Sequence, residues 1–209
     1  MKLDGQPALV VVDMQNGFCK PGGFMNKIGL DYTASAAVIE PVARLVGIAR
    51  QAGLPIVFTR YWLKPDYSDA GLLLELLPAA MEHGGMVRET WDGDLVEELQ
   101  PQSGDELLDK TRHSAFHETD FDERLKRLGV DALVICGVTT NVCVEATARD
   151  GFARDYRIVI VSDATAAVTP GMHTGTLTTI EYCMGEVATV DEVQEALANR
   201  SAQQTAGTR

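Results

Sequence analysis

The fold of this chain is decided by the stretch Ala132-Leu133-Val134-Ile135-Cys136-Gly137-Val138-Thr139-Thr140-Asn141-Val142-Cys143-Val144-Glu145. Its first half is an apolar, β-branched run that is typical of a strand buried on both faces. Gly137 interrupts the run, a short polar turn follows, and the residues after Cys143 suit a helix. The stretch therefore predicts a cysteine in the first turn of a helix, just past the carboxyl end of a central strand. Unpaired N–H groups and the helix dipole favour a thiolate there, and this edge of an open α/β sheet is where ligands bind.

Five further strands are predicted on either side of this one, at 8–13, 54–60, 105–110, 157–163 and 186–190. Helical periodicity predicts the main helices at 33–52, 119–128, 143–155, 171–185 and 191–198. Pro41 is awkward inside the first of these, so that helix is expected either to span 33–52 or to begin at Pro41. Six strands that alternate with helices predict an α/β fold, a three-layer α/β/α sandwich around a mainly parallel, doubly wound sheet. In this interpretation residues 1–198 form one domain, and 199–209 are a polar C-terminal tail that we expect to be frayed.

Two segments have no clear periodicity. Residues 14–29 are rich in Gly, Pro and Asn and predict a long loop at the carboxyl edge of the sheet, of the kind that carries function or covers a site. Residues 61–89 contain aromatics, prolines and a short apolar helix near 72–77. This second segment is expected either to shape a pocket or to be a plain surface excursion.

The composition narrows the class of partner. The formal net charge of −12 is spread over helix faces, which argues against nucleic acid and against an anionic membrane surface. The N-terminus shows no secretory leader, and no apolar run approaches the length of a membrane span, so we expect a cytoplasmic protein. Four cysteines without a C-x-x-C pair, Cys19, Cys136, Cys143 and Cys183, are expected to be free thiols.

Three chemically competent side chains lie at or just beyond the ends of predicted strands: Asp13, Lys110 and Cys143. Because the carboxyl ends of parallel strands share one edge of the sheet, these three can meet. An ammonium beside a thiol favours the thiolate, and a carboxylate can take the thiol proton and pass it to a departing amine. Backbone N–H groups of the turn before Cys143 could stabilise an oxyanion. Polar residues are common at strand ends because loops begin there, so none of the three residues would indicate a catalytic site by itself.

Three motifs, in this order, resemble those of the isochorismatase-like cysteine hydrolases over roughly residues 7–197. They are Val11-Val12-Asp13-Met14-Gln15-Asn16, Asp109-Lys110-Thr111-Arg112-His113-Ser114-Ala115-Phe116 and Gly137-Val138-Thr139-Thr140-Asn141-Val142-Cys143-Val144. The resemblance implies the strand order 3-2-1-4-5-6, a catalytic triad of Asp13, Lys110 and Cys143, and a cis peptide bond before Thr139. It further implies an oxyanion hole formed by the backbone N–H groups of Thr139 and Cys143, and a homo-oligomer, either a dimer or a tetramer.

The reaction implied by this resemblance is two-step acyl transfer at a small amide or ureido carbonyl. Asp13 deprotonates Cys143, the sulfur attacks, the amine leaves, and water activated by Asp13 cleaves the thioester. Isochorismatases proper cleave a vinyl ether and lack the cysteine, so Cys143 argues against that alternative. Nicotinamidases carry histidine ligands after the second strand, whereas here residues 59–66 contain none, so no metal is expected. No dinucleotide or P-loop fingerprint follows the first strand, so no cofactor is expected either.

Among the family's members, the ureidoacrylate, biuret and N-carbamoyl amide hydrolases resemble this chain more closely. That similarity rests on Pro21-Gly22-Gly23, Trp91-Asp92, the segment 139–147 and Arg149-Asp150-Gly151. A catalytically idle scaffold and a redox sensor that cycles through sulfenic acid remain the alternatives from other classes. All three triad residues are present, which counts against the scaffold, and no resolving cysteine lies nearby in sequence, which counts against the sensor.

Other residues are assigned by position. The candidates for substrate binding are Gln15, Asn16, Phe18, Arg60, Trp62 and Thr139. Arg60 and Trp62 could hold a carboxylate or stack on a planar ureido group, whereas Tyr67 is expected at the surface. The histidines His113, His117 and His173 lack metal-ligand spacing and are expected to be exposed. Cys136, Cys183 and Phe116 are expected to be packed in the core.

Overall fold

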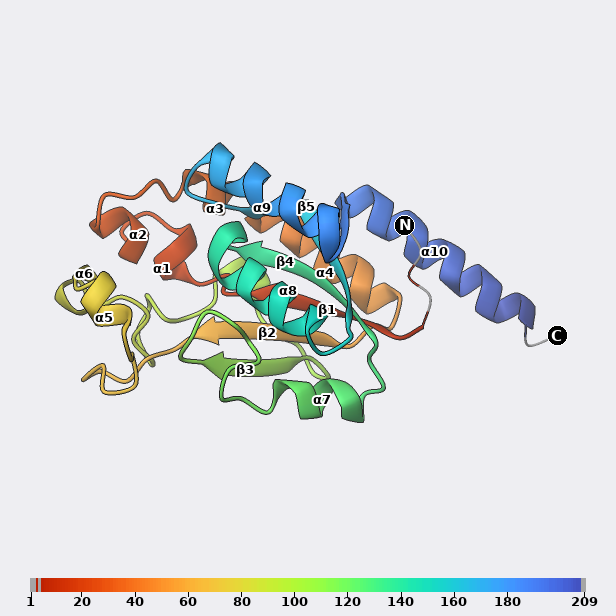
Figure 1. Cartoon of the computed structure of the whole chain (residues 1–209), viewed down its shortest axis with the longest axis horizontal. Helices are drawn as coiled ribbons and strands as arrows, with labels where there is room; N and C mark the ends of the chain where they lie inside the picture. Colours follow the sequence, from red (N-terminus) through yellow and green to blue (C-terminus); the bar gives the residue numbers. More distant parts are fainter. Residues whose placement is uncertain (1–2, 4, 208–209) are drawn as a thin grey trace.

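The computed structural model describes residue 3 and residues 5–207 of the chain, which form a layered α/β structure around one sheet (Figure 1). Its strands are β1 (Pro7–Val12), β2 (Ile56–Tyr61), β3 (Glu106–Lys110), β4 (Ala132–Val138), β5 (Arg157–Ala166) and β6 (Gly185–Ala188). They lie in the order β3-β2-β1-β4-β5-β6, and every neighbouring pair is parallel. The predicted doubly wound sheet and its strand order are therefore confirmed.

Helices cover both faces of the sheet. On one face pack α4 (Ile39–Gln51) and α10 (Val190–Gly207), and on the other α7 (Phe121–Arg127), α8 (Glu145–Phe152) and α9 (Pro170–Cys183). The central strand β1 shows how one apolar run serves both cores, since Leu9 and Val11 join one cluster while Val10 and Val12 join the other. No helix within residues 5–207 is both long and apolar enough to cross a membrane.

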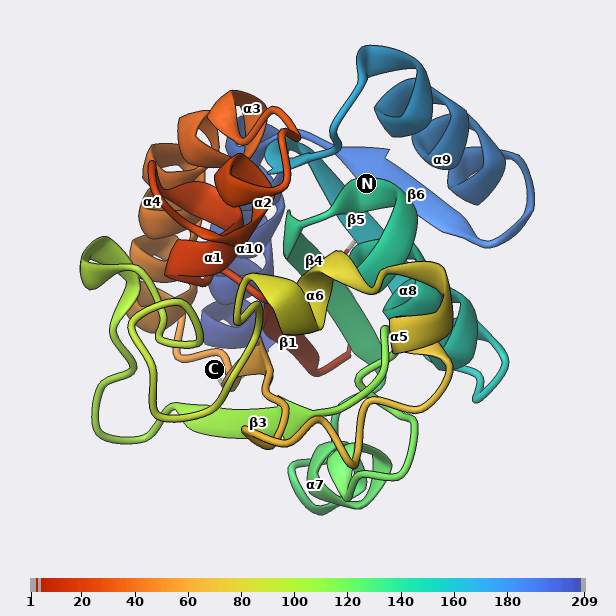
Figure 2. The same ribbon diagram turned by 90° about the vertical axis from the view of Figure 1, so that its left-hand side faces the viewer.

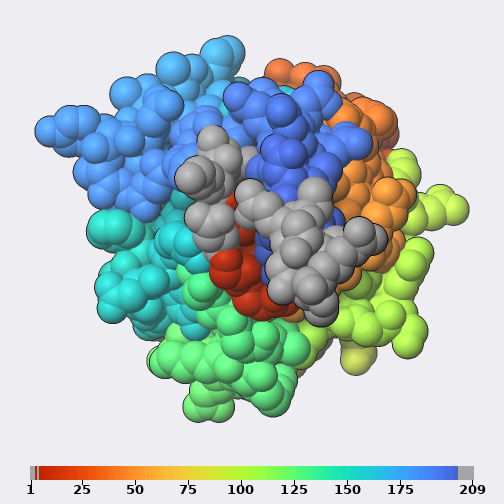
Figure 3. All heavy atoms as spheres, turned by 90° about the vertical axis from the view of Figure 1, so that its right-hand side faces the viewer, coloured from red at the N-terminus to blue at the C-terminus, as the bar shows by residue number. Residues whose placement is uncertain are grey.

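The two ends of the sheet differ in character. Short helices gather at the carboxyl ends of the strands, which face the viewer in Figure 2. They are α1 (Asn16–Cys19), α2 (Phe24–Lys27), α3 (Thr33–Ala37), α5 (Leu73–Leu76), α6 (Ala79–Glu82) and the 3₁₀ turn η1 (Glu97–Leu99). At the opposite end, shown in Figure 3, α10 lies beside the start of the chain, where Arg200 Nη2 donates to Gln6 Oε1 at 2.9 Å.

The structure corrects four sequence predictions. Residues 14–29 hold the two helices α1 and α2 rather than a plain loop. The helix expected either to span 33–52 or to begin at Pro41 is two helices that divide at Val38, the second starting two residues before Pro41, because Pro41 has no N–H to donate to the carbonyl of Ala37. Cys143 stands in a π-helical turn, η2 (Thr140–Val144), that precedes α8. The tail expected to fray from 199 continues α10 to Gly207, because its Ala, Gln and Arg residues are strong helix formers.

Gly137 allows β1 and β4 to approach each other at the carboxyl edge of the sheet. Its φ is 103°, and a Cβ at this position would overlap the backbone of Val12, whose N would lie 2.7 Å away. We expect Gly137→Ala to lower the free energy of unfolding by about 3 kcal/mol or more, since strain and overlap add. Urea denaturation of this variant checks the value.

The matched control is Gly47→Ala in the interior of α4, where nothing lies within 4 Å of the added methyl group. Alanine is the better helix former, so this variant should gain up to about 1 kcal/mol. Equal effects of the two substitutions would contradict the close approach assigned to Gly137.

Candidate active site

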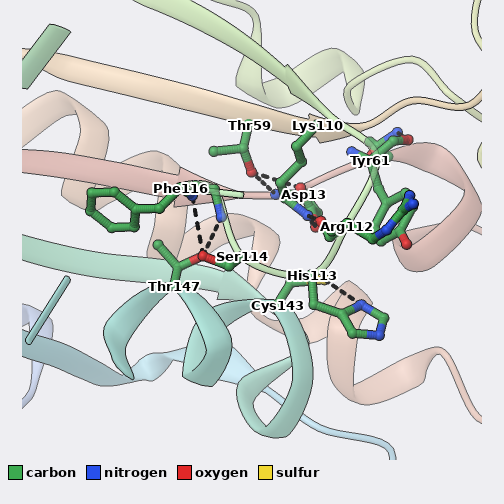
Figure 4. Close-up of polar contacts among 12 residues, drawn as sticks. Asp13, Thr59, Tyr61, Lys110, Arg112, His113, Ser114, Phe116, Cys143 and Thr147 are labelled. Atoms are coloured by element: carbon green, nitrogen blue, oxygen red, sulfur yellow. Dashed lines mark hydrogen bonds and ion pairs between the residues drawn. The ribbon is translucent and has the colours of Figure 1, made fainter. Parts of the chain in front are cut away.

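The carboxylate of Asp13 is held by two neighbouring strands (Figure 4). Lys110 Nζ, at the end of β3, donates to Asp13 Oδ2 at 2.6 Å, and Thr59 Oγ1, on β2, donates to Asp13 Oδ1 at 2.6 Å. The side chains of Asp13 and Lys110 are both completely buried. Lys110 also donates to the carbonyl of Arg112 at 3.1 Å and lies 4.5 Å from the centre of the Tyr61 ring. The strand ends thus fix an ion pair in the interior, with both carboxylate oxygens occupied.

The sulfur of Cys143 faces this pair from the other side of β1. The charges of Asp13 and Lys110 both act on the Cys143 thiol, and only 6% of the residue is exposed. Its Sγ also lies 3.8 Å from Nδ1 of His113, whose ring packs against Tyr61 at a centroid distance of 5.7 Å. The strand ends therefore bring Asp13, Lys110 and Cys143 together, and His113 joins them.

A chain of hydrogen-bonded hydroxyl groups stabilises the turn that contains Cys143. Thr165 Oγ1 donates to the carbonyl of Gly137 at 2.6 Å and lies 3.0 Å from Thr140 Oγ1. Thr140 Oγ1 in turn lies 2.9 Å from Nδ1 of His173. The peptide bond between Val138 and Thr139 is cis. The backbone at the end of β4 is thereby held in one conformation directly before the cysteine.

Burial raises the pKa of the Cys143 thiol, because the paired charges of Lys110 and Asp13 largely cancel and leave desolvation dominant. For Lys110, burial is the largest single influence and lowers the pKa, but the interactions with Asp13 and Cys143 together outweigh it and the pKa is raised. Burial therefore favours a protonated thiol beside Lys110 and Asp13 over the resting thiolate that the sequence predicts. The sulfur becomes nucleophilic only when a base takes its proton.

This protonation state predicts how Cys143 reacts with iodoacetamide. The rate of alkylation should still rise between about pH 7 and about pH 9, because the thiolate fraction keeps growing over that range. Cys143 should react faster than Cys136 throughout, since Cys143 lines a cavity while Cys136 is completely buried in the core. Peptide mass spectrometry of samples quenched at each pH checks both statements. A rate that levels off below about pH 7 would instead indicate a resting thiolate.

A cavity of ≈ 300 Å³ opens onto the sulfur. Its lining comes from segments far apart in the chain, namely α1 and α2, the end of β2, α5, and the turns after β3, β4 and β5. Apart from Cys143, the polar or titratable residues that line it are Tyr61, His113, Thr139 and Asn141. Within the described part of the chain, no group of three or more His, Cys, Asp or Glu side chains is arranged to hold a metal ion. The cavity is large enough for a small organic molecule placed against the thiol.

Comparison with known proteins shows the family to which this chain belongs. Residues 7–192 match the isochorismatase domain. The chain belongs to the isochorismatase family. It is 38% identical to the ureidoacrylate amidohydrolase of Methylorubrum extorquens over 207 residues, which cover 93% of this chain and 84% of that protein. The crystal structure of a cysteine hydrolase from Pseudomonas syringae pv. phaseolicola superposes with a TM-score of 0.85 at 35% identity and covers 93% of each chain.

A second solved relative is the N-carbamoylsarcosine amidase of Thermoplasma acidophilum, with 27% identity and a TM-score of 0.71 over 89% of this chain and 97% of that one. These similarities make the chain an amidohydrolase of the isochorismatase family, a hydrolase that acts on a carbon–nitrogen bond. The strand order predicted from the family resemblance agrees with this assignment.

Two of the substrate-binding residues predicted for this isochorismatase-family site, Phe18 and Thr139, line the cavity. Gln15 does not: it is completely buried, and its amide bonds to the backbone of Tyr61 and to the carbonyl of Gly93. Asn16 donates to the carbonyl of Trp91 and lines a different cavity. The prediction that Gln15 and Asn16 contact the substrate is therefore corrected: both side chains stabilise the loop after β1 by bonding to backbone groups.

The prediction for Arg60 and Trp62 is corrected as well. Side chains alternate along β2, so Tyr61 lines the cavity at Cys143 while Arg60 lines the separate one on the other side. Arg60 Nε and Nη2 donate to the carboxylate of Asp109 at 2.7 and 3.1 Å, and its guanidinium stacks on the ring of Trp62. Neither residue lines the cavity at Cys143.

Sequence reasoning missed Thr59, His113 and Asn141 as members of the isochorismatase-family site. Two of them stand close to a predicted triad residue, since His113 follows Lys110 by three positions and Asn141 precedes Cys143 by two. His113 and His117 are exposed as expected, but no role at the sulfur was foreseen for His113.

Three minor assignments are corrected too. His173 is half-buried against Thr140 rather than exposed. Tyr67 is buried and donates to the carbonyls of Ala80 and Gly85. Cys183 is exposed rather than packed, because it lies on the outer side of α9.

Proposed function

We propose that this chain cleaves a small amide or ureido compound through a thioester on Cys143, with Asp13 as the acid–base group and Lys110 as its charge partner. The observation that supports this most directly is the completely buried Lys110–Asp13 pair set against a thiol at a cavity wall. Burying two ionised groups costs several kcal/mol of desolvation before their attraction is counted. A fold that needed only stability would be served as well by apolar residues at those positions.

The proposed reaction starts from the protonated thiol of Cys143. As the thiol attacks the carbonyl carbon, its proton passes to Asp13, and the carbonyl oxygen becomes an oxyanion. The backbone N–H groups of Thr139 and Cys143, in the braced turn after β4, are proposed to donate to that oxyanion. The C–N bond then breaks as the amine takes the proton from Asp13. In the second half, Asp13 takes a proton from water as the hydroxide attacks the thioester. The C–S bond then breaks, the acid product leaves, and the sulfur takes the proton back from Asp13.

Lys110 holds Asp13 in place during these steps. Its positive charge remains beside the carboxylate while Asp13 alternately accepts and releases a proton. The bond from Thr59 to the other carboxylate oxygen restricts rotation of the carboxylate, so Asp13 keeps one orientation at the site.

The relatives narrow the substrate class. A ureidoacrylate amidohydrolase and an N-carbamoylsarcosine amidase, by their names, act on compounds that carry a terminal carbamoyl group. We therefore propose that the reacting group here is also a terminal amide or carbamoyl group, with ammonia as the first product.

The test is release of ammonia from a panel of primary amides, monosubstituted ureas and N-carbamoyl compounds, followed by intact-mass analysis of rapidly quenched samples. We expect at least one class to release ammonia and to leave an acyl adduct that maps to Cys143. Ammonia release with no adduct and full activity after Cys143 is blocked would contradict the thioester route. Failure of every compound in the panel would contradict the proposed function.

Two further properties, the oligomeric state and the cellular location, are proposed. We propose that the protein works as a homo-oligomer in the cytoplasm, because α5 and α9 expose large apolar side chains and the four cysteines are free thiols. Tyr182 is 87% exposed and Leu76 85% exposed. Multi-angle light scattering should give a mass of two or more chains, and a monomer at micromolar concentration would contradict this.

A further inference from the structure

The walls of the cavity at Cys143 are apolar almost throughout. Aliphatic, thioether and aromatic side chains from α1, α2, α5 and the loops between strands and helices surround the thiol. They are Phe18, Phe24, Met25, Ile28, Leu30, Leu73, Leu77, Met86, Val138, Val142, Val168 and Met172. A substrate that reaches the sulfur therefore exchanges water for hydrocarbon along most of its length.

No lysine or arginine is among the described residues that line this cavity. Each cation at the nearby strand ends is already engaged elsewhere. Lys110 is paired with Asp13 behind the sulfur, and Arg60 is paired with Asp109 on the other side of β2. Arg112 donates to the carbonyls of Asp69 and Thr111 at 2.7 Å.

His113 is the one lining side chain among the described residues that could become cationic. Part of the His113 ring is exposed, yet desolvation of its remaining part and the charge of Lys110 both lower the pKa of His113, so its ring is neutral at neutral pH. A carboxylate that entered the cavity would find no charged partner, and an unpaired buried carboxylate is strongly disfavoured.

One buried polar atom of a lining residue has no partner. Asn141 Oδ1 is buried without a hydrogen-bond donor, two residues before Cys143. A rotation of the Asn141 side chain toward the cavity would let this oxygen accept from the N–H of a terminal carbamoyl or amide group. The polar end of the cavity can thus recognise the reacting headgroup, while the remainder offers only apolar contacts.

We propose that this site selects uncharged substrates: a terminal amide or carbamoyl group held at Asn141 and Cys143, attached to a compact apolar substituent, with carboxylate-bearing analogues rejected. The proposal rests on the proposed amidohydrolase function and narrows it. It also separates this chain from its relatives that are named for ureidoacrylate and N-carbamoylsarcosine, since both of those compounds carry a carboxylate.

Isosteric substrate pairs test this selectivity. Succinamate and 4-methylpentanamide differ in a carboxylate against an isopropyl group, as do N-carbamoyl-β-alanine and 3-methylbutylurea. We expect kcat/KM for the neutral member of each pair to exceed that for the anion at least about 100-fold, since the anion must be desolvated without a partner. Equal values, or a preference for the anion, would overturn the proposal while leaving the amidohydrolase function intact.

A variant with a new charge at the rim should shift this preference. Met172, at the start of α9, lines the cavity yet is 49% exposed, so Met172→Arg can keep its guanidinium in water beside the mouth. We expect the neutral-to-anion ratio of kcat/KM to fall at least about 10-fold. Tyr182→Arg is the matched control, because it adds the same charge to the same helix at a residue that is 87% exposed and does not line the cavity. An equal change in both variants would overturn the assignment of selectivity to this cavity.

Alkylation gives a readout that needs no turnover. Iodoacetamide and iodoacetate are close in size and differ in charge, and the exposed Cys183 serves as an internal reference within the same molecule. We expect the iodoacetamide-to-iodoacetate rate ratio at Cys143 to exceed that at Cys183 at least about 10-fold. A ratio equal to or below that at Cys183 would overturn the proposed selectivity even if no compound in the panel were hydrolysed.

Discussion

Cys143→Ala is expected to lower kcat/KM for the best amide or ureido substrate by at least about 10,000-fold, which is the size of loss seen when a covalent nucleophile is removed. No other described cysteine lines the cavity, and Cys136 and Cys19 are buried in the opposite core, so none can replace the sulfur. The acyl adduct should disappear with the activity. Ammonia release and intact-mass analysis measure the two losses on the same samples.

The fold should survive this substitution. Cys143 lies at a cavity wall, so removing its sulfur relieves no strain and leaves the Lys110–Asp13 pair intact, and the free energy of unfolding should change by less than about 1.5 kcal/mol. Cys136→Ala is the matched control: it removes a completely buried sulfur from the same strand–turn segment, and its side chain packs in the other core and does not line the cavity. Cys136→Ala should keep activity within a few-fold of the parent. Comparable losses in both variants would point to disturbed packing rather than to a lost nucleophile.

The sheet could be predicted from the sequence because buried parallel strands read as continuous apolar runs. Strands β1 and β4 are such runs, and each is followed by a residue that starts a turn, Asp13 in one case and Thr139 in the other. The side chains at their carboxyl ends meet through topology alone, so Asp13, Lys110 and Cys143 could be brought together without any knowledge of the loops.

The cavity could not be predicted in the same way. Its walls come from 18–30, 73–77 and 168–172, which carry no shared periodicity and meet only through tertiary packing. Arg60 shows the resulting error: it is near Tyr61 in sequence, yet the alternation of β2 sends the two side chains to different cavities. The raised pKa of the Cys143 thiol could not be predicted either, because a position near the start of a helix says nothing about how completely the sulfur is buried.

Asp13→Asn is expected to damage both activity and stability, and the two effects have different causes. The amide cannot take the thiol proton, so kcat/KM should fall at least about 1,000-fold. The same change leaves the ammonium of Lys110 completely buried without its counter-charge, a situation that costs about 3–5 kcal/mol. Neither Cys143→Ala nor any change in the cavity wall removes a charge partner, so the loss of stability should be specific to the ion pair.

The double variant Asp13→Asn with Lys110→Met separates these effects. Removing the orphaned charge should recover most of the lost unfolding free energy, because a neutral pair of similar size no longer needs solvation, while activity stays absent. The single variant also has a pH signature. Without Asp13, burial lowers the pKa of Lys110 below that of the unfolded chain, so the destabilisation of Asp13→Asn should shrink as pH rises toward about 10, where the unfolded lysine also loses its proton.

Urea denaturation of the parent, both single variants and the double variant from about pH 6 to about pH 10 measures this coupling as an interaction free energy. A strongly non-additive result that weakens with pH is expected. Additive losses that do not depend on pH would mean that Lys110 and Asp13 do not stabilise each other as ions. In that case Asp13 would not be an anion paired with Lys110 and could not act as the base for the thiol. The acyl-transfer mechanism would then need another group to take the proton of Cys143.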